Sequence, residues 1–88
     1  MSNYELTFLT ANEKDKEEMD KLLKSAKAKI INETKWGERA LAYRIKKHSK
    51  AFYFTYNIVM PAENIADFKT KLGYNDKIIR YLLLKIEN

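Results

Sequence analysis

The sequence predicts an α+β fold in which two helices cover one face of a four-stranded antiparallel sheet. Four segments show the alternation of apolar and polar residues that is typical of half-buried strands, and two others have apolar residues at helical spacing. The chain has 88 residues, of which 45% are hydrophobic and 33% are charged, so it can bury a single core. We therefore expect one domain that spans residues 1–88.

The first strand is predicted over residues 3–10, where Tyr4, Leu6 and Phe8 share one face. A polar run follows, and Asn12 within it is a suitable start for a helix. The apolar stripe of this helix consists of Met19, Leu22, Leu23, Ala26 and Ile30. Its spacing predicts a helix of about four turns with a charged, solvated opposite face.

A second extended segment is predicted from about residue 29 to residue 47, with an irregularity at Trp36-Gly37. Near its end Leu41, Tyr43 and Ile45 alternate with smaller or charged residues, which predicts one bulky face. Residues 47–50 are expected to form a hairpin turn that leads into a third strand over residues 51–60.

Pro61 ends the third strand and can begin a helix, because its missing N–H group has no partner at a helix start. The apolar stripe of this second helix consists of Ile65, Phe68 and Leu72. Gly73 is predicted as its C-terminal cap, residues 74–76 as a turn and residues 78–86 as the last strand. The resulting order of elements is that of the ferredoxin-like β-α-β-β-α-β fold, in which one face of the sheet stays open.

The third strand loosely resembles an RNA-recognition motif, in which aromatic side chains of this strand stack on bases. That arrangement would expose the bulky residues Phe52, Phe54, Tyr56, Ile58 and Met60. Burying a large apolar side chain contributes roughly 1.5 to 3 kcal/mol, so we expect this set to face the helices instead. Tyr53 and Thr55 then lie on the open face with Leu82 and Leu84, and such an apolar patch indicates contact with a partner protein.

Positive charge is concentrated in residues 35–50, which contain six Lys or Arg residues and a single acid, Glu38. Their net charge of +5 equals that of the whole chain, and a concentrated positive potential suits a polyanion. The candidates for RNA binding in this segment are Lys35, Trp36, Arg39, Arg44, Lys46, Lys47 and Lys50. Arg and Lys bind phosphate and an aromatic ring stacks on a base. The alternative is that these lysines are merely solvated and protect a sheet edge from aggregation.

The residue types of common catalytic and metal sites are scarce. The chain has no cysteine, and His48 is its only histidine, so neither a metal site nor a pair of nucleophile and base can be assembled. The two glycines are isolated, which excludes a phosphate-binding glycine loop, and the longest apolar runs are far shorter than the ~20 residues of a membrane span. We expect no enzymatic activity, no metal or other cofactor, no small-molecule substrate and no membrane partner.

Several motifs occur in order along the chain. They are Tyr4-Glu5, Trp36-Gly37-x-Arg39-x-Leu41-Ala42-Tyr43-x-Ile45, Lys50-Ala51-x-Tyr53, Met60-Pro61 and Asn75-Asp76-x-Ile78-x-Arg80. Together they resemble the bacterial ribosomal protein S6 family (bS6) over essentially the whole length. The resemblance implies a ferredoxin-like, non-catalytic constituent of the small (30S) ribosomal subunit in the cytoplasm. It also implies binding to the central domain of 16S rRNA together with ribosomal protein S18.

The motifs of this family assign roles to individual positions. Arg80 joins the RNA-binding candidates, and Arg39, Lys46 and Lys50 are carried over within the basic segment. Arg44 stands where the family commonly has Pro, so we expect a more regular edge strand with an additional charge there. The candidates for contact with the partner protein remain Tyr53, Thr55, Leu82 and Leu84.

Two other functions fit the same residues. One is a stand-alone domain of the RNA-recognition-motif type that binds single-stranded RNA. The other is a ferredoxin-like regulatory or oligomerisation module, for which a stable dimer without RNA affinity would be the sign.

Overall fold

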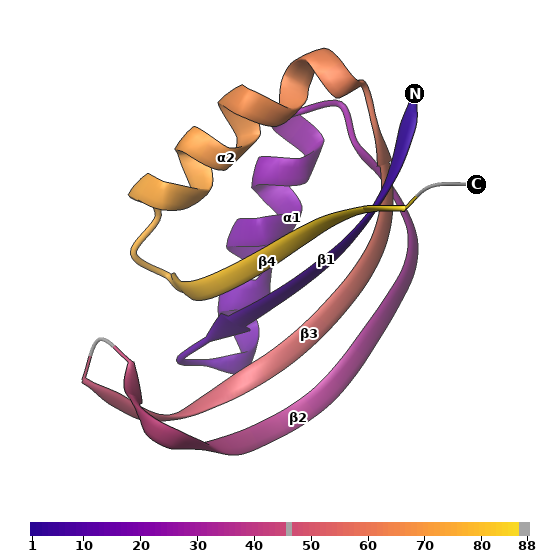
Figure 1. Cartoon of the computed structure of the whole chain (residues 1–88). Helices are drawn as coiled ribbons and strands as arrows, with labels where there is room; N and C mark the ends of the chain where they lie inside the picture. The colour runs from indigo at the N-terminus through magenta and orange to yellow at the C-terminus, as the bar shows by residue number, and fades with distance from the viewer. Residues whose placement is uncertain (46, 87–88) are drawn as a thin grey trace.

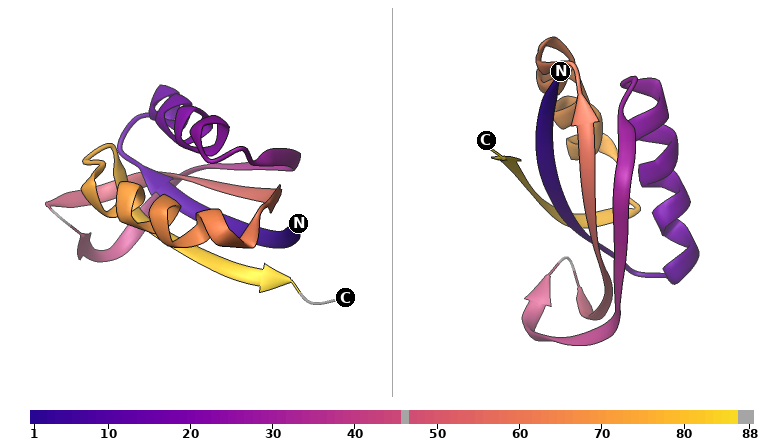
Figure 2. Two further views of the ribbon diagram at one scale, coloured as in Figure 1. Left: turned by 90° about the horizontal axis from the view of Figure 1, so that it is seen from above. Right: turned by 90° about the vertical axis from the view of Figure 1, so that its right-hand side faces the viewer.

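Two helices cover one face of a four-stranded antiparallel sheet in the computed structural model, which describes residues 1–45 and 47–86 (Figures 1 and 2). The strands are β1 (Ser2–Thr10), β2 (Lys29–Ile45), β3 (His48–Met60) and β4 (Ile78–Ile86). The helices are α1 (Lys16–Ser25) and α2 (Ile65–Tyr74), and each follows one turn of 3-10 helix, at Glu13–Asp15 and Ala62–Asn64. The strand order β2-β3-β1-β4 confirms the predicted ferredoxin-like fold.

The core lies between the helices and the covered face of the sheet. The bulky residues of β3 face the helices as predicted: Phe54, Tyr56, Ile58 and Met60 are buried, and Phe52 is half-buried against them. The ring of Phe8 on β1 stacks on Phe54, with ring centroids 5.2 Å apart, and meets Tyr56 edge to face at 5.1 Å. Burial of each such large side chain contributes roughly 1.5 to 3 kcal/mol to folding.

Tyr56 also carries a polar link from the sheet to α1. Its hydroxyl group donates a hydrogen bond of 2.9 Å to Asp20 Oδ1, and Lys16 Nζ lies 3.3 Å from the other oxygen of that carboxylate. Burial, the hydrogen bond to Asp20 and the negative charges of Asp20 and Glu33 raise the pKa of Tyr56 above its ordinary value. The hydroxyl therefore stays protonated and keeps its role as a donor.

α1 is shorter than predicted, because the chain turns out of the helix after Ser25. The N–H groups of Lys27 and Ala28 bond to the carbonyl groups of Lys24 and Leu23, which is the Schellman pattern, and Lys27 has the left-handed φ of 61° that this pattern requires. From the 3-10 turn before α2, Asn64 Nδ2 donates a 2.8 Å hydrogen bond to the carbonyl oxygen of Ala26. Ile30 therefore lies in β2 and not on the helix stripe.

The second helix follows Pro61 as predicted but ends later than Gly73. α2 continues to Tyr74, and its C-cap is Asn75, whose N–H bonds to the carbonyl oxygen of Leu72. Asn75 Oδ1 then accepts the N–H of Lys77, which closes the turn into β4. Because this side chain stabilises the turn, Gly73 needs no left-handed conformation and lies inside the helix.

Candidate functional site: the basic hairpin and the open face

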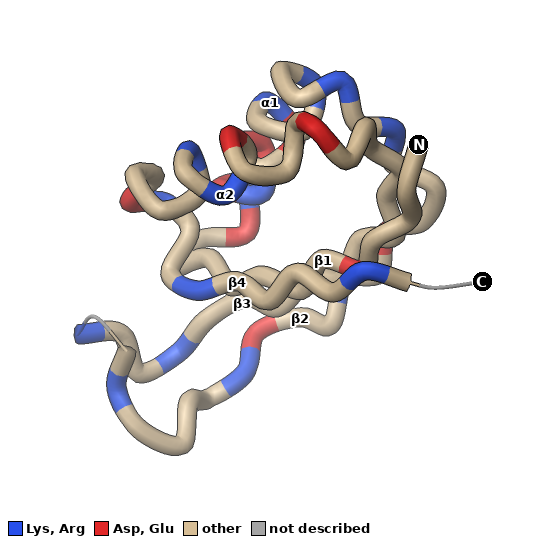
Figure 3. Tube along the Cα trace, turned by 45° about the horizontal axis from the view of Figure 1, so that its top comes forward, with Lys and Arg blue, Asp and Glu red and all other residues tan. Residues whose placement is uncertain are grey.

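The basic segment forms the hairpin between β2 and β3, and we call residues 35–50 the basic hairpin. Its end reaches beyond β1 and β4, and Lys and Arg positions recur along it, whereas the acidic positions gather mainly on the helices (Figures 1 and 3). The basic side chains described here are all exposed, namely Lys35, Arg39, Arg44, Lys47 and Lys50. Lys46, which was also predicted to bind RNA, lies outside the described residues.

The turn of the basic hairpin is tighter than predicted. Ile45 pairs with His48, and β3 already begins at His48, so the turn does not extend over residues 47–50 as predicted. Lys47 lies directly before β3 with a left-handed φ of 70°, a conformation that is common in hairpin turns. His48 is half-buried at the start of β3 rather than a solvated turn residue.

The predicted irregularity at Trp36-Gly37 is confirmed. The register of β2 against β3 shifts between Lys35 and Gly37, which leaves Trp36 as an extra residue, and Gly37 has a φ of 86°. A Cβ atom at Gly37 would meet no other atom within 4 Å, so the backbone conformation and not the space favours glycine. A bulge of this kind increases the twist of a strand and redirects its side chains.

A small apolar cluster, separate from the main core, anchors the end of the basic hairpin. Its buried members are Leu9, Ala51 and Ile79, and its half-buried members include Leu41, Ile45 and Tyr53. Tyr43 is 68% exposed, so the predicted bulky face includes Leu41 and Ile45 but not Tyr43. The cause is that pairing with β3 is interrupted between Ala40 and Ile45, so the strand is not regular around Arg44 either.

The cations of the basic hairpin are little neutralised. Lys35 Nζ lies 4.0 Å from Glu13 Oε1, and both side chains are exposed, so this ion pair is weak. No other ion pair involves a hairpin cation among the residues that the structure describes. Glu38 is the single acid within the segment, so the surface keeps a positive potential.

Trp36 lies beside the face of the sheet that is turned away from the helices. Its indole Nε1–H donates a hydrogen bond of 2.9 Å to Thr55 Oγ1 on β3, and Thr55 Oγ1 lies 3.2 Å from Thr7 Oγ1 on β1. The indole is therefore held by its edge, while the residue remains 50% exposed. Its expected role in RNA binding stays a prediction, and its position also suits contact with a protein.

We call the sheet face opposite the helices the open face. On β1, β3 and β4 its members include Glu5, Thr7, Leu9, Tyr53, Thr55, Asn57, Arg80, Leu82 and Leu84. Leu82 and Leu84 are 57% and 49% exposed, and Tyr53 and Thr55 are half-buried, so their predicted position is confirmed while their role stays a prediction. Thr7 and Leu9 join them, as the alternation along β1 already implies.

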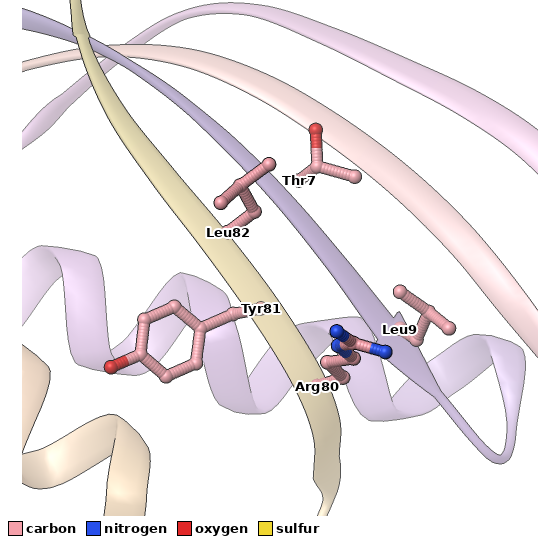
Figure 4. A pocket seen from close by; sticks show the side chains of 5 residues that line it. All are labelled: Thr7, Leu9, Arg80, Tyr81 and Leu82. Atoms are coloured by element: carbon pink, nitrogen blue, oxygen red, sulfur yellow. The ribbon is translucent and has the colours of Figure 1, made fainter. Parts of the chain in front are cut away.

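Arg80 belongs to the open face and not to the basic hairpin. It lies on β4, at the opposite edge of the sheet from β2, and it faces Leu9 of β1. With Thr7, Leu9, Tyr81 and Leu82 it lines a hollow of about 230 Å³ (Figure 4). This position does not test the predicted role of Arg80 in RNA binding, but it places Arg80 beside the exposed Leu82 of the open face.

Other kinds of site find no support in the described part of the chain. No group of three or more His, Cys, Asp or Glu side chains is placed to hold a metal ion within residues 1–45 and 47–86. Over the same residues, neither helix has the length and apolar character needed to cross a membrane.

Comparison with known proteins identifies relatives along nearly the whole chain. The family model described as ribosomal protein S6 matches residues 3–85. The small ribosomal subunit protein bS6 of Bartonella bacilliformis is 36% identical, over 99% of this chain and 69% of its own length. The bS6 protein of Zymomonas mobilis is 31% identical, over 99% of this chain and 76% of its own length.

Solved structures show the same fold. The crystal structure of 30S ribosomal protein S6 from Thermotoga maritima has a TM-score of 0.81 at 24% identity, over 97% of this chain and 87% of that one. An uncharacterized protein from the same organism has a TM-score of 0.58 at 17% identity, over 98% of both chains. At these identities the likeness concerns the fold alone.

Proposed function

Because the chain belongs to the ribosomal protein S6 family of the small ribosomal subunit, we propose that it binds the central domain of 16S rRNA together with ribosomal protein S18. Its role is that of a structural constituent, with no catalysis and no cofactor. The observation that carries this proposal is the adjacency of two unlike surfaces, the basic hairpin and the open face, on one small sheet.

The basic hairpin suits the RNA. Its described cations are exposed and, apart from Lys35, have no acidic partner among the described residues, so they are available for phosphate oxygens. Arg39 offers a planar guanidinium group for bidentate contact, and Lys50 offers a mobile point charge on the facing strand. Contacts of this kind position a protein on RNA without reading its sequence.

The open face suits the protein partner. Leu82 and Leu84 expose apolar surface on β4. Trp36 on β2 and Tyr53 on β3 add aromatic surface to the same face, nearer the opposite edge of the sheet. Aromatic residues are enriched at protein interfaces, where they supply much of the binding energy. Covering this face by a second protein removes the apolar surface from water.

A stand-alone RNA-recognition-motif function has lost its main support. It requires aromatic residues of β3 on the open face, but Phe54 is 1% exposed and Phe52 packs against the core beneath the helices. Tyr53, which does lie on the open face, is half-buried in the cluster below the basic hairpin. The regulatory or oligomerisation alternative remains distinguishable by sedimentation, since it requires a stable dimer without RNA affinity.

The test is the salt dependence of RNA binding by a double variant. We expect Arg39→Ala with Lys50→Ala to weaken binding to the central domain of 16S rRNA in the presence of S18. The slope of log affinity against log salt should become shallower by about 0.7 to 0.9 for each phosphate contact that is lost. Filter binding at several salt concentrations measures both quantities.

A matched control removes the same charge elsewhere. Lys24 and Lys69 are exposed lysines on α1 and α2, so Lys24→Ala with Lys69→Ala should leave the slope unchanged. Equal slopes for the two double variants would contradict the assignment of the basic hairpin to RNA.

A further inference from the structure

We propose that Arg80 binds a carboxylate group of the protein that covers the open face, and that an apolar side chain of the same protein fills the hollow beside it. This inference rests on the proposed function, because it names the chemistry of the partner at that face. It assigns Arg80 to protein recognition, whereas the family motif suggested RNA.

The small volume of the hollow favours a protein side chain over a free small molecule. Its volume is about 230 Å³, below the roughly 300 to 1,000 Å³ of pockets that hold small ligands. Leu9 and Leu82 supply apolar walls; in the strand register Thr7 lies opposite Leu82, and Leu9 lies opposite Arg80. Figure 4 shows Arg80 beside Leu9, with Tyr81 extending to the other side of β4.

The charge of Arg80 is the second argument. Among the described residues no carboxylate lies within ion-pair distance of its guanidinium group. Of the open-face residues named above, Glu5 is the only acid, and it lies four residues from Leu9 along β1, about 13 Å for an extended chain. Arg80 is therefore a cation beside the exposed apolar surface of Leu82, without an ion-pair partner in the described part of the chain.

Covering such a surface has an energetic consequence. A protein that buries Leu82 also excludes water from the neighbouring guanidinium group, and an unpaired buried charge is strongly destabilising. A carboxylate of the partner protein offsets the cost of burying this charge by accepting two parallel charge-assisted hydrogen bonds from the guanidinium group. Arg offers this bidentate geometry and Lys does not. The complementary partner is thus an acidic residue flanked by an apolar one.

The neighbours of Arg80 favour protein over RNA at this position. Phosphate binding usually needs several cations along one groove, as in the basic hairpin. Within residues 1–45 and 47–86, the other residues that line the hollow are Leu9, Leu82, Thr7 and Tyr81, so the described lining holds no second cation. An Arg next to exposed apolar residues is instead the composition of a protein interface centre.

The test compares three variants of the full chain in binding to purified S18. We expect Arg80→Gln to weaken binding at least 10-fold, and Arg80→Lys to weaken it less, because Lys keeps the charge but loses the bidentate geometry. Lys85→Gln is the matched control, since it removes one exposed cation from the same strand, and it should leave the affinity unchanged. Thermal unfolding shows whether each variant remains folded, which the exposure of Arg80 leads us to expect.

Charge reversal identifies the partner group. Arg80→Glu should lose binding, and replacing one acidic residue of S18 with Lys should restore it, which a merely structural role of Arg80 would not produce. Unchanged affinity for Arg80→Gln would overturn the inference. A second result would also overturn it: Arg80→Gln makes the salt slope of RNA binding shallower but leaves the affinity for S18 unchanged. That result would assign Arg80 to a phosphate group of the RNA.

Failure of this inference differs from failure of the proposed function. Leu82→Asp places a negative charge on the exposed apolar part of the open face and should abolish S18 binding if that face is the interface. If Leu82→Asp abolishes binding while Arg80→Gln has no effect, only the role of Arg80 is wrong. If the unmodified chain does not bind S18 at all, the proposed function and this inference fall together.

Discussion

The two faces of the sheet are built from the same strands but have opposite properties. On the covered face Phe8, Phe54 and Tyr56 are at most 1% exposed, whereas on the open face Leu82 and Leu84 are about half exposed. Because successive side chains of a strand point to opposite faces, one short sequence supplies both a core and a surface. The comparison teaches that stability and binding can be changed separately here, even by substitutions at neighbouring positions of one strand.

Truncation of Phe54 tests this separation with the largest expected effect. Phe54→Ala removes a buried ring that stacks on Phe8, and substitutions of this kind cost about 3 to 5 kcal/mol of unfolding free energy. On the open face, Leu82→Ala should change the unfolding free energy by no more than about 0.5 kcal/mol. Urea denaturation monitored by circular dichroism measures both values. Similar losses for the two variants would contradict the comparison.

Removal of the Tyr56 hydroxyl group should have an intermediate effect. Tyr56→Phe keeps the ring but loses the hydrogen bond to Asp20, for which we expect a loss of about 1.5 kcal/mol. Urea denaturation near neutral pH provides the measurement. A loss as large as that of Phe54→Ala would mean that the ring itself had moved.

The same variant should alter the response to alkaline pH. The folded state raises the pKa of Tyr56, so above pH ~10 the unfolded chain releases a proton that the folded chain retains. Stability is therefore fully present below that pH and falls as pH rises above it. We expect the fall to be less steep for Tyr56→Phe, and equal pH profiles would show that Tyr56 does not contribute.

The smallest expected effect concerns the hydroxyl group that holds Trp36. Thr55→Val removes the acceptor of the indole N–H, at an expected cost below about 1 kcal/mol, while Thr55→Ser keeps it. Trp36 is the only tryptophan, so fluorescence anisotropy and emission report on this side chain alone. We expect a more mobile indole in Thr55→Val only, and identical spectra for the two variants would show that Thr55 does not position Trp36.

Much of the fold could be predicted because the apolar alternation is strong. Burial of Phe54, Tyr56, Ile58 and Met60 beneath the helices followed from the free energy of burying large side chains, which leaves little choice of face. The ends of elements were harder to predict. Ile30 fits the spacing of α1, but a left-handed Lys27 and a hydrogen bond from distant Asn64 end that helix earlier. Likewise, Gly73 was predicted as the C-terminal cap of α2, but Asn75 is the cap residue.

The candidate site could be predicted only in part, because closeness in sequence is not closeness in space. Trp36 is next to Lys35 in the chain, but the bulge at Gly37 and the bond to Thr55 place it beside the open face. Arg80 carries the same charge as the cations of the basic hairpin, but it lies on β4 beside the exposed Leu82. Leu9 and Ile79 gave no sign that the hairpin end would pack against them, since that cluster joins residues of all four strands.

The sequence by itself determined the ferredoxin-like order of elements, the side of β3 that faces the helices and the concentration of positive charge in residues 35–50, because each depends on local periodicity or composition. Tertiary structure decided where α1 ends, which side of the sheet receives Trp36 and what surrounds Arg80. Those outcomes depend on the register of strands that are distant in the chain, and on hydrogen bonds such as that of Asn64 to Ala26, which no local pattern contains.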